Sequence, residues 1–150
     1  MQTDIERRED YRVLAVIPTL GERLETLART LNSIGGQTGV AVDAIVVTKS
    51  ASRDLDALVS ACGATILSHE GHISAAINAG LRAAGAEHKY MFWLGDDDLL
   101  RPGALAKACE ALERNPSATV CFGRCDYIDL DGNLLFSRRP PLFAPFLLRF

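Results

Sequence analysis

Short apolar runs alternate with amphipathic segments along most of this sequence, from residue 13 onward. Val13–Ile17 is a continuous apolar run, which is typical of a strand that is covered on both faces. Similar runs predict four further strands, at Val42–Thr48, Ala64–Leu67, Tyr90–Leu94 and Ala118–Phe122.

Helices are expected between these strands. The first carries leucines at helical spacing and ends at Gly35-Gly36, the second covers Ser52–Cys62, and the third covers Ile73–Ala84. A fourth begins at Pro102, which suits the first position of a helix, and stops before Asn115-Pro116. Repeated strand–helix–strand units predict a Rossmann-like α/β fold, with a mostly parallel sheet, right-handed crossovers and helices on both faces.

A closing hairpin is expected after the last helix. Tyr127–Leu130 and Asn133–Phe136 flank Asp131-Gly132, which is a turn signal for a short hairpin. We expect this hairpin to join the sheet at one edge, which would make the sheet mixed.

The two ends of the chain differ from its middle. We interpret residues 1–12 as a polar N-terminal extension, residues 13–136 as the α/β domain and residues 137–150 as an apolar tail. Either the tail packs on a second copy of the chain, on another partner or on a membrane surface, or the sequence stops within a domain. We favour the last interpretation, because a natural C-terminus is seldom this apolar.

The composition argues against several classes of protein. A formal net charge of −3 and an isoelectric point near 5.6, without a basic cluster, argue against nucleic-acid binding. No stretch approaches the ~20 apolar residues of a transmembrane helix, and the charged N-terminus does not resemble a signal peptide. We therefore expect a cytoplasmic protein, with membrane contact through the tail left open. The cysteines lack metal-finger spacing, and His69-Glu70-Gly71-His72 lacks that of a helical zinc motif.

Three consecutive aspartates, Asp96-Asp97-Asp98, follow the Tyr90–Leu94 run and Gly95. Three carboxylates at the end of a strand repel one another unless a cation absorbs their charge. Mg²⁺ and Mn²⁺ take oxygen ligands and commonly share them with a phosphate-bearing substrate. The alternative is a solvated acidic turn that introduces the next helix.

Other polar residues are expected to follow the parallel strands at the same edge of the sheet. They are Pro18–Arg23 after the first strand, Thr48-Lys49-Ser50 after the second, and Gly71-His72 leading into the helix that carries Asn78. Ligands of open α/β sheets bind at the carboxyl ends of the strands, so this edge is the candidate site.

Four segments carry a resemblance to a known family. They are VIPTLGER (Val16–Arg23), ISAAINAGLRAAG (Ile73–Gly85), YMFWLGDDDLLRPGAL (Tyr90–Leu105) and YIDLDGNLL (Tyr127–Leu135). In this order and spacing, over about residues 12–136, the chain resembles the family 2 glycosyltransferases, whose nucleotide-binding half has the GT-A fold.

The resemblance implies a nucleotide-diphosphate sugar as donor, with Mn²⁺ or Mg²⁺ bridging its diphosphate. Asp97 matches the metal ligand of the family's Asp-x-Asp motif, and Asp96 the residue that meets the ribose or a metal-bound water. Asp98 either supports the metal ion or orients the following turn. Thr19 and the backbone of Pro18–Gly21 match the loop that touches the nucleotide base.

Three further matches keep an alternative beside them. Arg23 either contacts the nucleotide or is a solvated residue at the start of a helix. Asn78 either binds the donor or packs the helix. His72 stands where the family often has a basic side chain near the phosphates, and it would serve there if protonated.

Two departures from the family limit this interpretation. The family usually carries acids after the second strand, one of which binds uracil, whereas Thr48 and Lys49 stand here. Lys49 either selects a different base or is a surface lysine. Nothing after Phe136 matches the segment that carries the general base of inverting members, so no catalytic base is assigned.

The leading hypothesis is the donor-binding half of an inverting glycosyltransferase, which passes a sugar to an acceptor hydroxyl. A non-catalytic nucleotide-sugar-binding module is the alternative, favoured by the missing acids and disfavoured by the intact aspartates. A nucleotidyltransferase would need a glycine-rich basic loop after the first strand, and an aspartyl phosphatase would need an aspartate there. We expect the chain to bind donor yet to lack efficient transfer, because the acceptor half is not recognisable.

Overall fold

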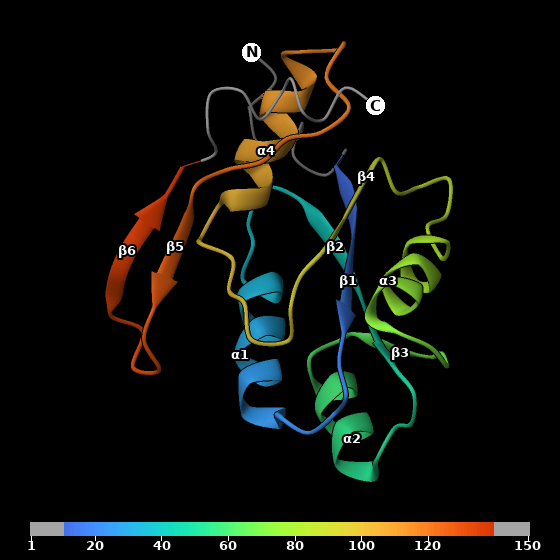
Figure 1. Ribbon diagram of the computed structural model, residues 1–150. Coiled ribbons are helices and arrows are strands. Elements are labelled where there is room, and N and C mark those ends of the chain that lie inside the picture. The colour runs from blue at the N-terminus through green and yellow to red at the C-terminus, as the bar shows by residue number, and fades with distance from the viewer. Residues whose placement is uncertain (1–10, 140–150) are drawn as a thin grey trace. The chain divides into compact units, whose positions relative to one another are not determined.

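The computed structural model describes residues 11–139 (Figure 1). The chain divides into two compact units, Met1–Cys109 and Glu110–Phe150. Residues 1–10 and 140–150, which hold most of the predicted N-terminal extension and apolar tail, lie outside the described residues.

The first unit contains a four-stranded parallel sheet in the order β3-β2-β1-β4. Its strands are β1 (Arg12–Pro18), β2 (Ala41–Thr48), β3 (Thr65–Ser68) and β4 (Tyr90–Trp93). The helices between them are α1 (Leu24–Gly35), α2 (Arg53–Ala61) and α3 (Ile73–Leu81). The predicted mostly parallel α/β fold is therefore confirmed, with element ends within a few residues of those expected.

Alternating side chains of β1 build two separate cores. Ala15 and Ile17 pack with residues of α1 and α2, whereas Leu14 and Val16 pack toward α3. All four side chains are fully buried, which is why the sequence of this strand is apolar on both faces. Figure 1 shows the result, with α3 across the sheet from α1 and α2.

A glycine lets α3 approach the sheet closely. A Cβ atom at Gly80 would lie 2.4 Å from Cγ1 of Val16 and 3.1 Å from Cγ2 of Val47, distances that ordinary packing does not allow. The small residues predicted for this helix therefore serve close packing against β1 and β2.

The beginnings of the helices differ in how they are capped. Ser52 caps α2 by accepting a hydrogen bond from the backbone N–H of Leu55 at 3.2 Å. Arg23 occupies the same position of α1 without a side-chain cap, so its side chain is available for contacts outside the helix.

Helix α4 (Ala104–Glu113) begins later than predicted. Pro102 and Gly103 form a turn in front of it, and Gly103 has a φ of +69°, which a helix cannot continue. The prediction of Pro102 at the first helical position was therefore wrong by two residues.

The strand predicted at Ala118–Phe122 is wrong, because these residues have no strand structure and pair with none of the described strands. Their apolar run favours a strand locally, but a strand forms only where a neighbour takes its backbone hydrogen bonds. Val120 and Phe122 are exposed.

The predicted hairpin exists as β5 (Cys125–Ile128) and β6 (Leu134–Arg138). The rings of Tyr127 and Phe136 stack at 4.4 Å between their centroids, and the backbone N–H of Asp129 donates to the carbonyl of Asn133. Within residues 11–139 these strands form a sheet of their own, so the expectation of a mixed sheet is wrong.

None of the helices within the described part of the chain is long and apolar enough to cross a membrane.

Candidate functional site

The order of the strands creates a switch point between β1 and β4. From β1 the chain winds through α1 to β2, and it reaches β4 later through α3 on the opposite face. Neighbouring strands whose connections leave in opposite directions open a crevice at their carboxyl ends, which is where ligands of such sheets bind. The residues that follow β1 and β4 meet there.

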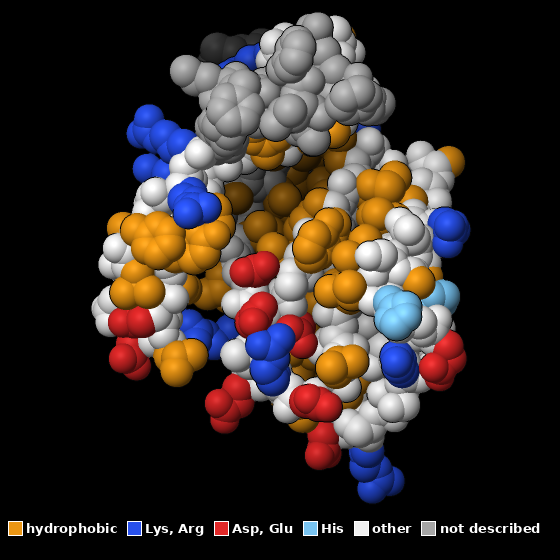
Figure 2. Space-filling model, in the orientation of Figure 1, with side chains coloured by type: hydrophobic (Ala, Val, Ile, Leu, Met, Phe, Trp, Pro, Cys, Tyr) orange, Lys and Arg blue, Asp and Glu red, His pale blue; other side chains and the backbone are white. Residues whose placement is uncertain are grey.

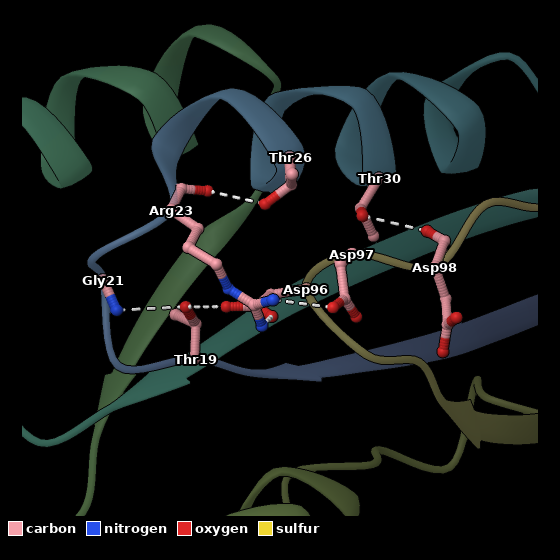
Figure 3. Close-up of polar contacts among 8 residues, drawn as sticks. All are labelled: Thr19, Gly21, Arg23, Thr26, Thr30, Asp96, Asp97 and Asp98. Carbon is pink, nitrogen blue, oxygen red and sulfur yellow. Dashed lines mark hydrogen bonds and ion pairs between the residues drawn. The ribbon is translucent and has the colours of Figure 1, made fainter. Parts of the chain in front are cut away.

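Thr19 and Asp96 join the two strands across this point. The Thr19 hydroxyl donates to Oδ2 of Asp96 at 2.6 Å and accepts from the backbone N–H of Gly21 at 3.0 Å (Figure 3). Gly21 has a φ of +76°, so the turn that brings its N–H to Thr19 suits glycine. Both side chains are buried, so their mutual hydrogen bond fixes the orientation of the Asp96 carboxylate.

Arg23 bridges two of the three aspartates. Its Nη2 atom lies 2.5 Å from Oδ1 of Asp96, and its Nη1 atom lies 2.7 Å from Oδ2 of Asp97. Figure 3 shows its side chain reaching from the start of α1 to both carboxylates. The hydrogen bond with Asp97 and the charges of both aspartates raise the pKa of Arg23 above its ordinary value. Arg23 thus supplies part of the positive charge that the aspartates require.

Asp97 and Asp98 present carboxylate oxygens on the exposed side of the loop. A Cβ atom at Gly95 would lie 3.1 Å from Oδ1 of Asp97 and 2.9 Å from Oδ2 of Asp98, so both oxygens converge on the space that this glycine leaves open. In Figure 3 the Asp98 carboxylate points away from α1.

This donor set suits a hard divalent cation that is shared with a ligand. Within residues 11–139, no three His, Cys, Asp or Glu side chains come together as a complete metal site. Two converging carboxylates with open space beside them fit Mg²⁺ or Mn²⁺ only if phosphate oxygens complete the coordination.

Helix α1 fixes the backbone that follows the aspartates. The Thr30 hydroxyl donates to the carbonyl of Asp98 at 2.9 Å, and the Ser33 hydroxyl accepts from the N–H of Leu100 at 3.1 Å. Gln37, which is buried, donates to the carbonyl of Arg101 and accepts from the N–H of Leu105. Two side chains of α1, together with Gln37 two residues beyond its end, therefore fix the loop between β4 and α4.

A pocket of about 300 Å³ opens at the carboxyl edge of the sheet. Its lining combines apolar residues with charged and hydroxyl side chains. They are Pro18, Thr19, Leu20, Glu22, Arg23, Val47, Thr48, Lys49, His69, Gly71, Ile73, Ala76 and Asp96. Figure 2 shows acidic and basic side chains gathered near the middle of the face drawn, with apolar side chains next to them.

The pocket brings together six of the residues that the sequence singles out as nucleotide-sugar ligands. These are Pro18, Thr19, Arg23, Thr48, Lys49 and Asp96, and Gly21 is hydrogen-bonded to one of them. His72 and Asn78 are exposed on α3 and do not belong to the lining. Their proposed contacts with the donor stay predictions.

The sequence predicts no side-chain role in this wall for Leu20, His69, Ile73 and Ala76. His69 follows β3, and its backbone N–H donates to the carbonyl of Thr48 at 2.9 Å, which carries it to the pocket. Its position after a strand was a signal for the same edge. The exposed apolar residues Leu20 and Ile73 had no such signal, because isolated surface hydrophobics are common.

Comparison with solved structures shows the same fold in three chains. S. aureus TarS 1-349 aligns with a TM-score of 0.59 and 16% identity, over 70% of this chain and 33% of that one. The longer S. aureus TarS gives 0.57 and 16%, over 69% and 20%. The 4-diphosphocytidyl-2C-methyl-D-erythritol synthase from Anaerococcus prevotii gives 0.54 and 14%, over 87% and 66%. At these identities the likeness concerns the fold alone.

The chain spans a third or less of the length of the two TarS chains. No curated protein sequence matches it. The sequence profile described as Glycosyl transferase family 2, in contrast, matches residues 14–148, which includes both strands of the switch point, the pocket and the three aspartates. The resemblance seen in the sequence is thereby confirmed, and the chain belongs to glycosyl transferase family 2.

Proposed function

We propose that this chain binds the donor of a glycosyltransferase, a nucleotide-diphosphate sugar whose sugar is passed, with inversion, to an acceptor hydroxyl. The observation that carries the proposal is the pocket at the switch point, whose wall includes Asp96 held by Thr19 and Arg23. Membership of family 2 supports glycosyl transfer as the type of reaction. The donor, the inversion and the use of metal are proposals.

The nucleoside part of the donor suits the wall formed by the ends of β1 and β2. Leu20 is 69% exposed and Ile73 62% exposed, although both line the pocket, so a flat base between them would remove apolar surface from water. The Thr19 and Thr48 hydroxyls stand in the same wall. Asp96, nearly buried at 7% exposure, would accept a hydrogen bond from a ribose hydroxyl.

The diphosphate suits the side of the pocket that borders the aspartates. Asp97 and Asp98 would hold a divalent cation there, and the cation would neutralise the charge that grows on the leaving diphosphate. Arg23 and Lys49 add positive charge from the pocket wall. The backbone that carries these two aspartates is held by hydrogen bonds with Thr30 and Ser33 of α1.

Transfer needs an acceptor held in line and a base within hydrogen-bond reach of its hydroxyl. We assign neither to the described residues. This chain spans only a third or less of the TarS chains. Sugar transfer by the whole protein, with its acceptor and its catalytic base, therefore stays a proposal. A cytoplasmic location, a membrane contact and self-association through the tail stay predictions.

Thermal unfolding with and without ligand tests the proposal. UDP with Mn²⁺ is expected to raise the melting temperature, and Asp97→Ala to abolish most of that rise, because a ligand that binds only the folded state stabilises it. Without ligand, Asp97→Ala should unfold at or slightly above the wild-type temperature, since it relieves repulsion among the aspartates.

Asp131→Ala is the matched control, because it removes an exposed aspartate from the hairpin loop, outside the pocket lining. It should leave the ligand-induced rise intact. Unfolding of metal-free Asp97→Ala would instead make the aspartates structural, and the assignment would be wrong.

A non-catalytic nucleotide-sugar-binding module is the second candidate. It is favoured by Thr48 and Lys49 in the pocket wall, where the family usually has acids. Slow hydrolysis of a UDP-sugar in the presence of Mn²⁺, lost in Asp97→Ala, would favour the enzyme, because a module without activation of the leaving group would not hydrolyse it.

A further inference from the structure

The loop after β4 holds three carboxylates, and the guanidinium of Arg23 is already bonded to two of them. Arg23 holds each carboxylate through a different terminal nitrogen, and it also belongs to the pocket wall. It therefore touches the space for a donor and the carboxylates that would hold a cation.

We propose that Arg23 is a built-in counter-ion of the aspartates, which competes with the divalent cation for Asp97 and so makes cation binding depend on the nucleotide. This inference deepens the proposed function and rests on it. Without nucleotide, the guanidinium neutralises Asp97 and weakens its binding of Mg²⁺ or Mn²⁺. With a diphosphate in the pocket, the same guanidinium has a second anion to bind.

The two bonds of Arg23 are not equivalent. The Asp96 side chain is 10% exposed and also accepts from Thr19, whereas the Asp97 side chain is 49% exposed. A buried carboxylate that accepts two hydrogen bonds is held more firmly than an exposed one, because water competes for the hydrogen bonds of the exposed carboxylate. Asp97 is therefore the partner that Arg23 releases, and Asp96 the one that it keeps.

Charge gives the direction of the effect. A guanidinium bonded to Oδ2 of Asp97 repels any cation that approaches the same carboxylate, and it occupies one of the two oxygens. A diphosphate reduces both effects. Its negative charge attracts the cation, and its oxygens accept hydrogen bonds from the guanidinium, which can then leave Asp97. The order expected is nucleotide first, or nucleotide and cation together.

Direct binding of Mn²⁺ to the nucleotide-free protein tests this proposal. The free Mn²⁺ signal in electron paramagnetic resonance gives the dissociation constant without any enzymatic activity. Arg23→Gln is expected to bind Mn²⁺ about two- to fivefold more tightly than the wild type, the range of a partly screened ion pair. Arg23→Lys should lie between the two, because a single ammonium cannot span both carboxylates in the same way.

Arg53→Gln is the matched control, since Arg53 is exposed at the start of α2 and outside the pocket lining. It removes the same charge and should leave Mn²⁺ binding unchanged. A second titration with UDP present should reduce the difference between Arg23→Gln and the wild type, because the diphosphate now engages Arg23.

Unchanged or weaker Mn²⁺ binding by Arg23→Gln overturns the proposal. If Arg23→Gln does not fold, Arg23→Lys carries the test, and affinity equal to the wild type overturns the proposal in the same way. The proposed function fails separately, if wild type with UDP binds no more Mn²⁺ than UDP alone does.

Discussion

The two edges of the parallel sheet each carry an arginine–aspartate ion pair, but the two pairs have different surroundings. At the amino edge, Arg12 at the start of β1 binds Asp43 of β2 with Nε–Oδ2 at 2.5 Å. At the carboxyl edge, Arg23 binds Asp96 and Asp97. Both are arginine–aspartate pairs between segments far apart in sequence, yet only the carboxyl-edge pair lines the pocket.

At the amino edge, Arg12 neutralises the charge of Asp43. Asp43 accepts from Arg12 and from Nε2 of His88, whose Nδ1 accepts from the N–H of Gly85. The hydrogen bond from Arg12, ahead of that from His88, holds the pKa of Asp43 below its usual range. One carboxylate with two donors has no remaining charge for a cation, so this cluster ties β1, β2 and the loop before β4 together.

The carboxyl edge has more carboxylates than cations. Arg23 neutralises part of the charge of Asp96 and Asp97, and Asp98 adds a third carboxylate close to Asp97 across Gly95. An excess of negative charge beside a pocket attracts a cation with its anionic ligand. The comparison teaches that an ion pair indicates a site only where its charges do not balance and a ligand has room.

Asp96→Asn and Asp43→Asn compare the two edges most directly. Asp96→Asn should weaken UDP–Mn²⁺ binding by about tenfold or more, because it removes a charge-assisted acceptor from the pocket wall. Asp43→Asn should leave that affinity nearly unchanged. Isothermal titration calorimetry gives both constants, and equal losses in the two variants would contradict the difference between the edges.

Lys49→Asp tests whether Lys49, the lysine in the pocket wall, selects the nucleotide base. A lysine cannot accept the hydrogen bond that uracil N–H offers, whereas an aspartate can. The variant should bind UDP more tightly by ~1–3 kcal/mol, with a smaller change for CDP, whose ring N3 carries no hydrogen to donate. Strong UDP selectivity in the wild type, unaltered in Lys49→Asp, would remove Lys49 from base recognition.

Gln37→Ala tests whether the residue that follows α1 helps to position the aspartate loop. It deletes the hydrogen bonds to the carbonyl of Arg101 and the N–H of Leu105, at a cost of about 1–2 kcal/mol in the free energy of unfolding. It should also weaken UDP–Mn²⁺ binding, although Gln37 is outside the pocket lining. Urea unfolding and calorimetry measure the two effects, and Asn32→Ala, at an exposed position of α1, is the control.

Asp43→Asn should have the smallest effect, and its pH dependence identifies it. The lowered pKa of Asp43 stabilises the fold fully above the unfolded pKa of about 3.8, and this contribution is lost as pH falls through the lower folded value. At pH 7 the variant should lose about 0.2–1 kcal/mol, the range of exposed ion pairs. The loss should vanish well below pH 3.8, and urea unfolding that shows the same loss there would exclude the charge as its cause.

The local pattern of the sequence determined most of the fold. Apolar runs and helical spacing predicted β1 to β4 and α1 to α3, since a strand buried on both faces and an amphipathic helix each leave a periodic signature. The aspartates, Thr19 and Lys49 could be assigned to one edge by the same reasoning, because parallel strands end together. The strand expected at Ala118–Phe122 failed, because its formation depends on a partner that no local pattern encodes.

Only the tertiary structure decided what the charged side chains bind. Arg23 and Asp96 are 73 residues apart, and Gln37 is 64 residues from the carbonyl that it holds. The sequence left Arg23 open between a nucleotide contact and a solvated helix start, whereas the fold bonds it to two aspartates. Side-chain partners of this kind depend on the register of β1 against β4 and on the packing of α1, which arise only when the whole sheet assembles.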